Sequence, residues 1–160
     1  MSDTLKVCGL TIERGTKLRT YLPVPDTNVK IPLTIINGDQ DGPTLLITAG
    51  IHGGEYPGIA AAMELGRDIE PEHVAGCLIM MHPVNIQGFW ARREMIVPED
   101  GKNLNRVFPG DPMGTLADKT AYLISNNFFS IADFYADMHS GDIHESCIPM
   151  FTTPASLRLK

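Results

Sequence analysis

The sequence predicts an α/β fold built on a mixed, partly parallel sheet with helices on both faces. Two apolar runs of strand length, at 44–49 and 77–81, lack polar alternation, which is typical of strands covered on both faces. Residues with helical spacing lie between them, and a strand–helix–strand unit places its two strands parallel. With 160 residues, of which 43% are hydrophobic and 20% charged, the chain is long and apolar enough to bury such a core.

The first part of the chain favours short strands or hairpins. Residues 5–36 are rich in Thr, Val, Ile and Leu and are interrupted by glycines and by the turn cluster at 23–26. We therefore expect residues 1–43 to form N-terminal strands and hairpins that lead into a domain spanning 44–160.

The remaining elements follow in order. A glycine-rich turn at 50–54 precedes a helix over 57–66, whose proline suits a first helical turn. Residues 85–113 have no clear period and predict a long surface loop, a length that is unusual unless functional. Apolar residues at helical spacing predict a helix over 116–131, and 134–138 form a third strand.

Charge and cysteine content exclude several classes of protein. The formal net charge of −6 offers no basic footprint for nucleic acid. No apolar stretch reaches the roughly 20 residues of a membrane span, and the N-terminus lacks a signal-peptide pattern. The scattered Cys8, Cys77 and Cys147 indicate reduced structural thiols. We expect a cytoplasmic protein with no nucleic-acid or membrane partner, and a homo-oligomer is compatible with the sequence.

Polar side chains follow three predicted strands. His52, Asn85 and His139 stand at the carboxyl ends, the edge at which open α/β sheets bind ligands. His52 and Glu55 are three positions apart, so that their side chains can converge, and His139 comes 84 residues after Glu55. Two histidines and a glutamate suit zinc with a fourth position open to water, which indicates a catalytic metal.

A purely structural interpretation accounts for the same residues. His52 and Glu55 can form a hydrogen-bonded pair at a helix N-terminus, where a carboxylate is favoured, and His139 can be a satisfied core histidine. A metal-free nucleotide-binding domain is the weakest alternative, because the glycine-rich turn has neither of the common phosphate-loop patterns.

Four ordered motifs resemble those of the zinc carboxypeptidase superfamily, and within it the succinylglutamate desuccinylase/aspartoacylase branch. They are AGIHGGEYPG at 49–58, HPVNIQGF at 82–89, DGKNLNRVFPG at 100–110 and DMHSGD at 137–142. The resemblance implies a zinc carboxypeptidase-like fold, with 44–160 as the N-terminal part of the catalytic domain. It also implies one Zn²⁺ per chain, held by His52, Glu55 and His139.

The resemblance assigns further roles. Asn105 and Arg106 match the pair that reads the substrate carboxylate, and a planar guanidinium suits bidentate carboxylate binding. The family carries another arginine upstream that polarises the scissile carbonyl. Glu94 stands at that position in an ungapped comparison, so Arg92 and Arg93 are the candidates, and Lys102 is a further basic group for anion recognition.

The family's general base, a glutamate on a late strand, is expected beyond Lys160. Glu145 lies too close to His139 to match it and is expected in a loop, with Asp142 as a turn residue or a support for the metal ligands. The resemblance thus predicts a zinc-dependent hydrolase of amide C–N bonds that deacylates carboxylate-bearing N-acyl amino acids. A zinc carboxypeptidase, or a silent zinc- and carboxylate-binding module without the base, are the alternatives.

Overall fold

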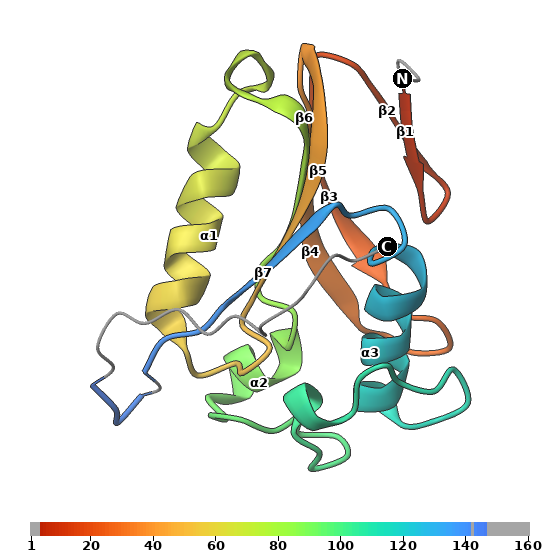
Figure 1. Cartoon of the computed structure of the whole chain (residues 1–160). Coiled ribbons are helices and arrows are strands. Elements are labelled where there is room, and N and C mark those ends of the chain that lie inside the picture. The colour runs from red at the N-terminus through yellow and green to blue at the C-terminus, as the bar shows by residue number, and fades with distance from the viewer. Residues whose placement is uncertain (1–3, 142, 147–160) are drawn as a thin grey trace.

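The computed structural model describes residues 4–141 and 143–146. Its main feature is a five-stranded sheet in the order β3-β4-β6-β5-β7 (Figure 1). The strands are β3 (Thr16–Pro23), β4 (Lys30–Asn37), β5 (Gln40–Ala49), β6 (Ala75–Met81) and β7 (Phe134–Met138). β5 runs parallel to β6 and β7, whereas β4 is antiparallel to β3 and β6. The predicted mixed, partly parallel sheet is confirmed.

The N-terminal stretch forms four strands within its described residues. β1 (Thr4–Val7) and β2 (Leu10–Glu13) make a separate antiparallel hairpin. β3 and β4, in contrast, pair within the main sheet. The first 43 residues therefore supply both a peripheral hairpin and two strands of the central sheet.

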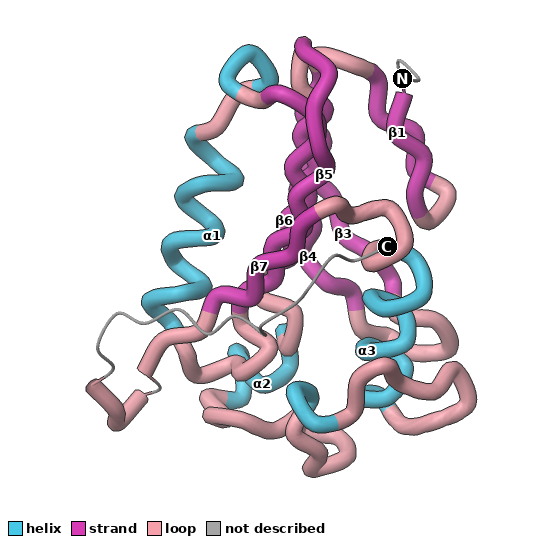
Figure 2. Tube along the Cα trace, viewed as in Figure 1, coloured by secondary structure: helices cyan, strands magenta, loops and turns pink. Residues whose placement is uncertain are grey.

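Side chains along β6 alternate between two apolar clusters. Cys77, Ile79 and Met81 join the larger cluster, to which α3 (Leu116–Asn127) also contributes, and Leu78 and Met80 join a smaller one. Helix α1 (Tyr56–Asp68) packs on β5, β6 and β7, on the opposite side of the sheet from α3 (Figures 1 and 2). Both faces are covered, which explains why the run 77–81 of β6 is apolar at every position.

Helix α1 lies close to the sheet because small residues face it. A Cβ added at Gly66 would lie 3.2 Å from Nε2 of His82 and 3.3 Å from Oγ1 of Thr34. These two buried groups are hydrogen bonded to each other at 3.1 Å. Burial lowers the pKa of His82, so this ring favours its neutral form beneath the helix.

The predicted loop over 85–113 is wrong in its first part, where residues Ile86–Ala91 form the short helix α2. Asn85 starts this helix, because its Oδ1 accepts the backbone N–H of Gly88 at 2.9 Å. The single-turn 3-10 helix η2 (Leu104–Arg106) lies further along the same segment, and η1 (Pro71–His73) precedes β6. Helices α2 and η2 are too short for the spacing of their apolar residues to show a helical period in the sequence.

Helix α3 begins as predicted but ends at Asn127, four residues before the expected end. Phe128 is fully buried, and residues 128–131 turn the chain toward β7. Asp118 stabilises the start of the helix, because its carboxylate accepts the backbone N–H of Thr115 at 2.9 Å.

Cys77 is buried in β6, where burial raises the pKa of its thiol to about 12, and Cys8 is half-buried. Both are free thiols, as expected, and Cys147 lies outside the described residues. Among the helices that the structure describes, none combines the length and apolar character needed to cross a membrane.

Replacing Phe128 by Ala is expected to lower the free energy of unfolding by ~3–5 kcal/mol, because a fully buried ring is lost between α3 and the sheet. Phe134 provides the matched control, since its side chain is 61% exposed and its truncation should change stability by less than ~1 kcal/mol. Urea denaturation monitored by circular dichroism measures both. Equal losses in the two variants would contradict the described core.

Candidate metal centre

Three residues predicted as metal ligands converge at the carboxyl edge of the sheet. Nδ1 of His52 lies 2.8 Å from Oε1 of Glu55, and Nδ1 of His139 lies 2.9 Å from Oε2 of the same carboxylate. One ligand atom from each residue falls within a group no wider than 4.8 Å, and the imidazole centroids are 5.0 Å apart. His52 and Glu55 are buried, whereas the His139 side chain is 34% exposed, so this edge remains open to solvent on one side.

Two glycines allow the loop from β5 to α1 to carry the first two ligands. A Cβ at Gly53 would lie 2.4 Å from the backbone nitrogen of Phe89, and one at Gly54 would lie 2.9 Å from Cα of Glu94. Larger residues would displace α2 and the segment that follows it. Because the two glycines let the loop make a tight turn against these neighbours, the side chains of His52 and Glu55 can point toward each other.

The third candidate ligand, His139, follows the end of β7, and Asp137 and Thr48 hold it. Nε2 of His139 lies 2.7 Å from Oδ2 of Asp137, whose other oxygen accepts the hydroxyl of Thr48 at 2.7 Å. Thr48 and Asp137 are partners in the parallel β5–β7 register. The sheet itself therefore orients the His139 ring, with Nδ1 facing Glu55.

The electrostatics of the group follow from this packing. Burial opposes ionisation of Glu55, but hydrogen bonds from His139, His52 and the Ser140 backbone outweigh it and lower the pKa of Glu55 to about 2. Hydrogen bonds to Asp137 and then to Glu55 raise the pKa of His139 to about 10. At neutral pH the site therefore holds an ionised carboxylate against a protonated imidazole.

The donor set fits a divalent metal such as zinc. Both histidines present Nδ1 to the shared carboxylate, and their Nε2 atoms are held from outside by oxygen atoms of Asn103 and Asp137. An imidazole held in this way directs its other nitrogen to a metal, and the pattern is common around zinc ligands. The interpretation of His139 as a core histidine does not fit its exposure.

Three residues of this arrangement were not singled out from the sequence. Asn103 contacts Nε2 of His52 at 3.2 Å, Asp137 contacts His139, and the Ser140 backbone N–H donates to Oε2 of Glu55 at 3.1 Å. Asp137 stands two positions before His139, which places both side chains on one face of a strand. The two-residue spacing of Asp137 and His139 could have indicated this contact from the sequence. No sequence pattern indicated the contact between Asn103 and His52.

The segment with the candidate arginines lies against the loop that carries His52 and Glu55. The backbone N–H of Gly54 donates to the carbonyl of Glu94 at 3.2 Å. Arg92 and Arg93 immediately precede this contact and are exposed, and within the described part of the chain neither guanidinium is hydrogen bonded or ion-paired. Arg92 also lines an open cavity of about 630 Å³ together with Tyr56 and other apolar residues of α1 and α2.

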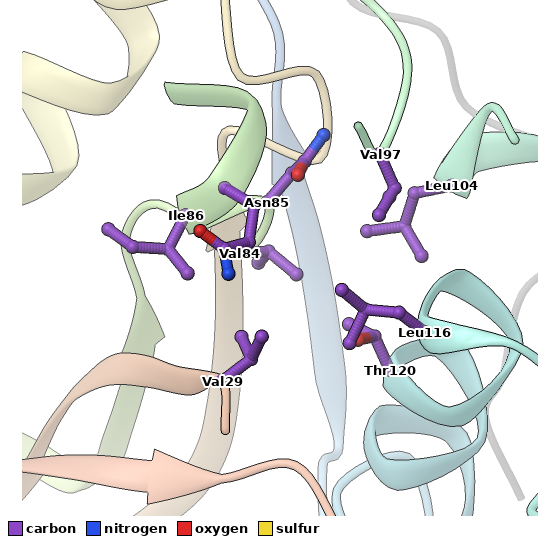
Figure 3. Close-up of a pocket in the computed structure, with 9 residues that line it drawn as sticks. Val29, Val84, Asn85, Ile86, Val97, Leu104, Leu116 and Thr120 are labelled. Atoms are coloured by element: carbon purple, nitrogen blue, oxygen red, sulfur yellow. The ribbon is translucent and has the colours of Figure 1, made fainter. Parts of the chain in front are cut away.

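Asn105 and Arg106 lie on η2, at the end of a tightly held loop. Leu104, which precedes Asn105, is fully buried. Its side chain and that of Val97 point toward α3 (Figure 3). The cavity between these side chains has a volume of about 10 Å³, which leaves room for no more than one water molecule. This apolar contact anchors the loop, while Arg106 remains exposed.

Among the described residues, the other predicted polar side chains make no hydrogen bond to the three candidate ligands. Asn85 is buried, and besides capping α2 it donates from Nδ2 to the carbonyl of Ile96 at 3.0 Å. Lys102 pairs with Asp118 at the start of α3 and so holds the loop. Glu145 is exposed, and Asp142 lies outside the described residues.

Comparison with known proteins identifies the family of the chain. Residues 41–158 match the succinylglutamate desuccinylase/aspartoacylase catalytic domain. The chain belongs to this family. The resemblance in the sequence motifs is thereby confirmed, and so is the fold.

Members of the succinylglutamate desuccinylase/aspartoacylase family include a curated relative and several solved structures. The N-alpha-acetyl-L-2,4-diaminobutyric acid deacetylase of Halomonas elongata is 39% identical over 81% of this chain and 39% of its own length. The product-bound ectoine utilization protein EutE (DoeB) of Ruegeria pomeroyi is 37% identical with a TM-score of 0.72, over 78% of this chain and 40% of that one. A desuccinylase/aspartoacylase structure from Rhodobacter sphaeroides is 35% identical with a TM-score of 0.70, over 79% and 40%. The chain thus spans about two fifths of the length of these relatives.

The opposite charges of Glu55 and His139 predict how the stability of the metal-free protein depends on pH. The pKa of His139 rises from 6.5 to about 10 on folding, so its stabilisation is complete below pH 6.5 and is lost as the pH rises through 10. The pKa of Glu55 falls from 4.5 to about 2, so its contribution is present above pH 4.5 and is lost as the pH falls through 2. In the presence of a chelator, the free energy of unfolding should therefore fall between pH 6.5 and 10.

The Asp137→Asn variant should show a smaller decline, because the hydrogen bond to the Asp137 carboxylate contributes most to the raised pKa of His139, and this substitution removes the carboxylate charge. Urea titrations at pH 6, 8 and 10 on both proteins measure the difference. Parallel curves would contradict the described pairing.

Proposed function

We propose that the chain carries the metal centre of a zinc-dependent amidohydrolase that removes acyl groups from N-acyl amino acids. The observation that carries the proposal is the convergence of His52, Glu55 and His139 at the open edge of the sheet. The chain that forms this sheet belongs to a family named for deacylases. One Zn²⁺ per chain is the expected occupant, because two imidazoles and a carboxylate form a catalytic zinc set with one position left open.

Each group of the chain has a chemical task in this reaction. When bound, zinc supplies Lewis-acid polarisation and activates water toward an amide carbonyl. Arg106 and Asn105 bind the substrate carboxylate at the end of the anchored loop. Arg92 or Arg93 donates to the amide carbonyl as negative charge develops on its oxygen, since both adjoin the segment that contacts Gly54.

Deacylation of a small amino acid is favoured over carboxypeptidase activity. The Halomonas elongata relative is named for deacetylating an N-acetylated amino acid, and it is similar to this chain over 81% of its residues. We therefore propose N-acetyl amino acids with a free carboxylate as the first substrates to test. Peptide C-terminal hydrolysis by the zinc-loaded protein, without N-acyl amino acid hydrolysis, would overturn this assignment.

Replacing either His52 or His139 by Ala should reduce the zinc content of the purified protein from about one ion per chain to well below half, because a three-ligand site loses one donor. His73 is exposed on η1 and serves as the matched control, whose Ala variant should retain the wild-type content. Elemental analysis after dialysis against zinc-free buffer measures all three variants. Stoichiometric zinc in both ligand variants would remove the proposed site.

Replacing Arg106 by Ala in a catalytically active form of the protein should weaken transition-state binding of carboxylate-bearing substrates by ~2–5 kcal/mol, since a desolvated charge pair is lost. Amidated analogues should lose little, and Arg67→Ala provides a control because that exposed arginine pairs with Asp68. Steady-state kinetics on N-acetyl amino acids and their amides give kcat/KM for each pair. Equal losses for both substrate types would assign Arg106 a structural role.

A further inference from the structure

The side-chain oxygen of Asn103 has two neighbours that belong to different parts of the site. It accepts the backbone N–H of Asn105 at 2.9 Å and lies 3.2 Å from Nε2 of His52, which stands 51 residues earlier in the chain. An amide oxygen has two lone pairs, so it can accept both hydrogen bonds at once. A single atom thus touches a candidate metal ligand and the start of the candidate carboxylate-binding turn.

The contact with Asn105 determines which way the amide of Asn103 faces. A backbone N–H can only donate, so the atom that receives it must be Oδ1 and not Nδ2. Nε2 of His52 then faces an acceptor and must itself carry a proton. In the neutral imidazole that binds a metal, this leaves the lone pair on Nδ1, the atom that lies 2.8 Å from Oε1 of Glu55 in the metal-free structure.

The position of Asn103 is well held from both sides. Its backbone pairs with Ile96 in an isolated bridge, and Val97 donates to the carbonyl of Lys102 at 2.9 Å. The next residue, Leu104, is fully buried. The amide oxygen therefore sits on a loop that cannot move freely away from His52.

The two histidines also differ in the charge of the group that holds them. His139 faces the carboxylate of Asp137, whereas His52 faces the neutral amide of Asn103. A neutral acceptor fixes the proton on Nε2 without adding negative charge to a site that already contains the ionised Glu55. The partner of His52 is therefore suited to orienting the ring more than to raising its basicity.

We infer that Asn103 is a positioning residue that selects the Nε2–H tautomer of His52 for metal binding and, through the same oxygen, holds the turn that carries Asn105 and Arg106. The second part rests on the proposed function, because it uses the role given to those two residues. Metal binding and carboxylate recognition are in this way tied to one side chain.

Three variants of the whole chain separate this role from general loop stability. Asn103→Ala removes the shared oxygen, and Asn103→Asp retains an acceptor at that position. Asp100→Ala is the matched control. Asp100 accepts the backbone N–H of Lys102 in the same loop at 3.0 Å and that of Ala117 in α3 at 2.8 Å, and it does not hydrogen bond to His52. Melting temperatures of all variants report the loss of loop stability alone.

The readouts are taken without substrate. Long-range ¹H–¹⁵N spectra of the histidine rings in the zinc-loaded protein report the tautomer of His52, and competition with a chromophoric chelator gives the zinc affinity. Hydrogen exchange of the Asn105 amide reports the second bond. We expect the Nε2–H form in the wild type, the Asp100→Ala control and Asn103→Asp.

In Asn103→Ala we expect a zinc affinity lower by roughly 10–100-fold and faster exchange at the Asn105 amide, as for the loss of a residue that orients a metal ligand. Wild-type affinity and exchange in that variant, or an equal loss of affinity in Asp100→Ala, would overturn the inference. An Nδ1–H tautomer in the wild type would do the same. Because no measurement depends on turnover, absence of amide hydrolysis would reject the proposed function and leave this result standing.

Discussion

The buried carboxylate of Glu55 is the constraint around which this end of the molecule is arranged. A carboxylate that is 6% exposed keeps its charge only if hydrogen bonds and opposite charge replace the water that it has lost. His52, His139 and the Ser140 backbone supply these contacts. The groups come from two loops that follow different strands, so the charge is satisfied only when β5 and β7 are paired in their observed register.

This requirement extends into the sheet and the helices. The register that places Thr48 opposite Asp137 lets the hydroxyl of one hold the carboxylate of the other, which in turn orients His139. On the other side, Gly53 permits α2 to lie against the ligand loop without a clash. The site is therefore stabilised by the same contacts that join the elements to one another.

The loop over 97–106 contains a single turn of 3-10 helix, and contacts with α3 hold it in place. Its apolar residues Val97 and Leu104 pack toward α3 (Figure 3). Lys102 pairs with Asp118 at the start of that helix. The two basic residues Lys102 and Arg106 of this loop differ in their surroundings. Lys102 pairs with the start of α3, whereas Arg106 is exposed to solvent.

Sequence alone determined the features that depend on neighbouring residues. The apolar runs at 44–49 and 77–81 required strands covered on both faces, and the spacing of His52 and Glu55 allowed a shared site because three positions span one short turn. The tertiary structure decided the rest. Helix α2 is too short to show a period, and the partners of the two histidine rings depend on where distant segments pack. Asn103 approaches His52 across 51 residues because the burial of Leu104 and the pairing with Ile96 position its loop, and no local pattern encodes a contact of that kind.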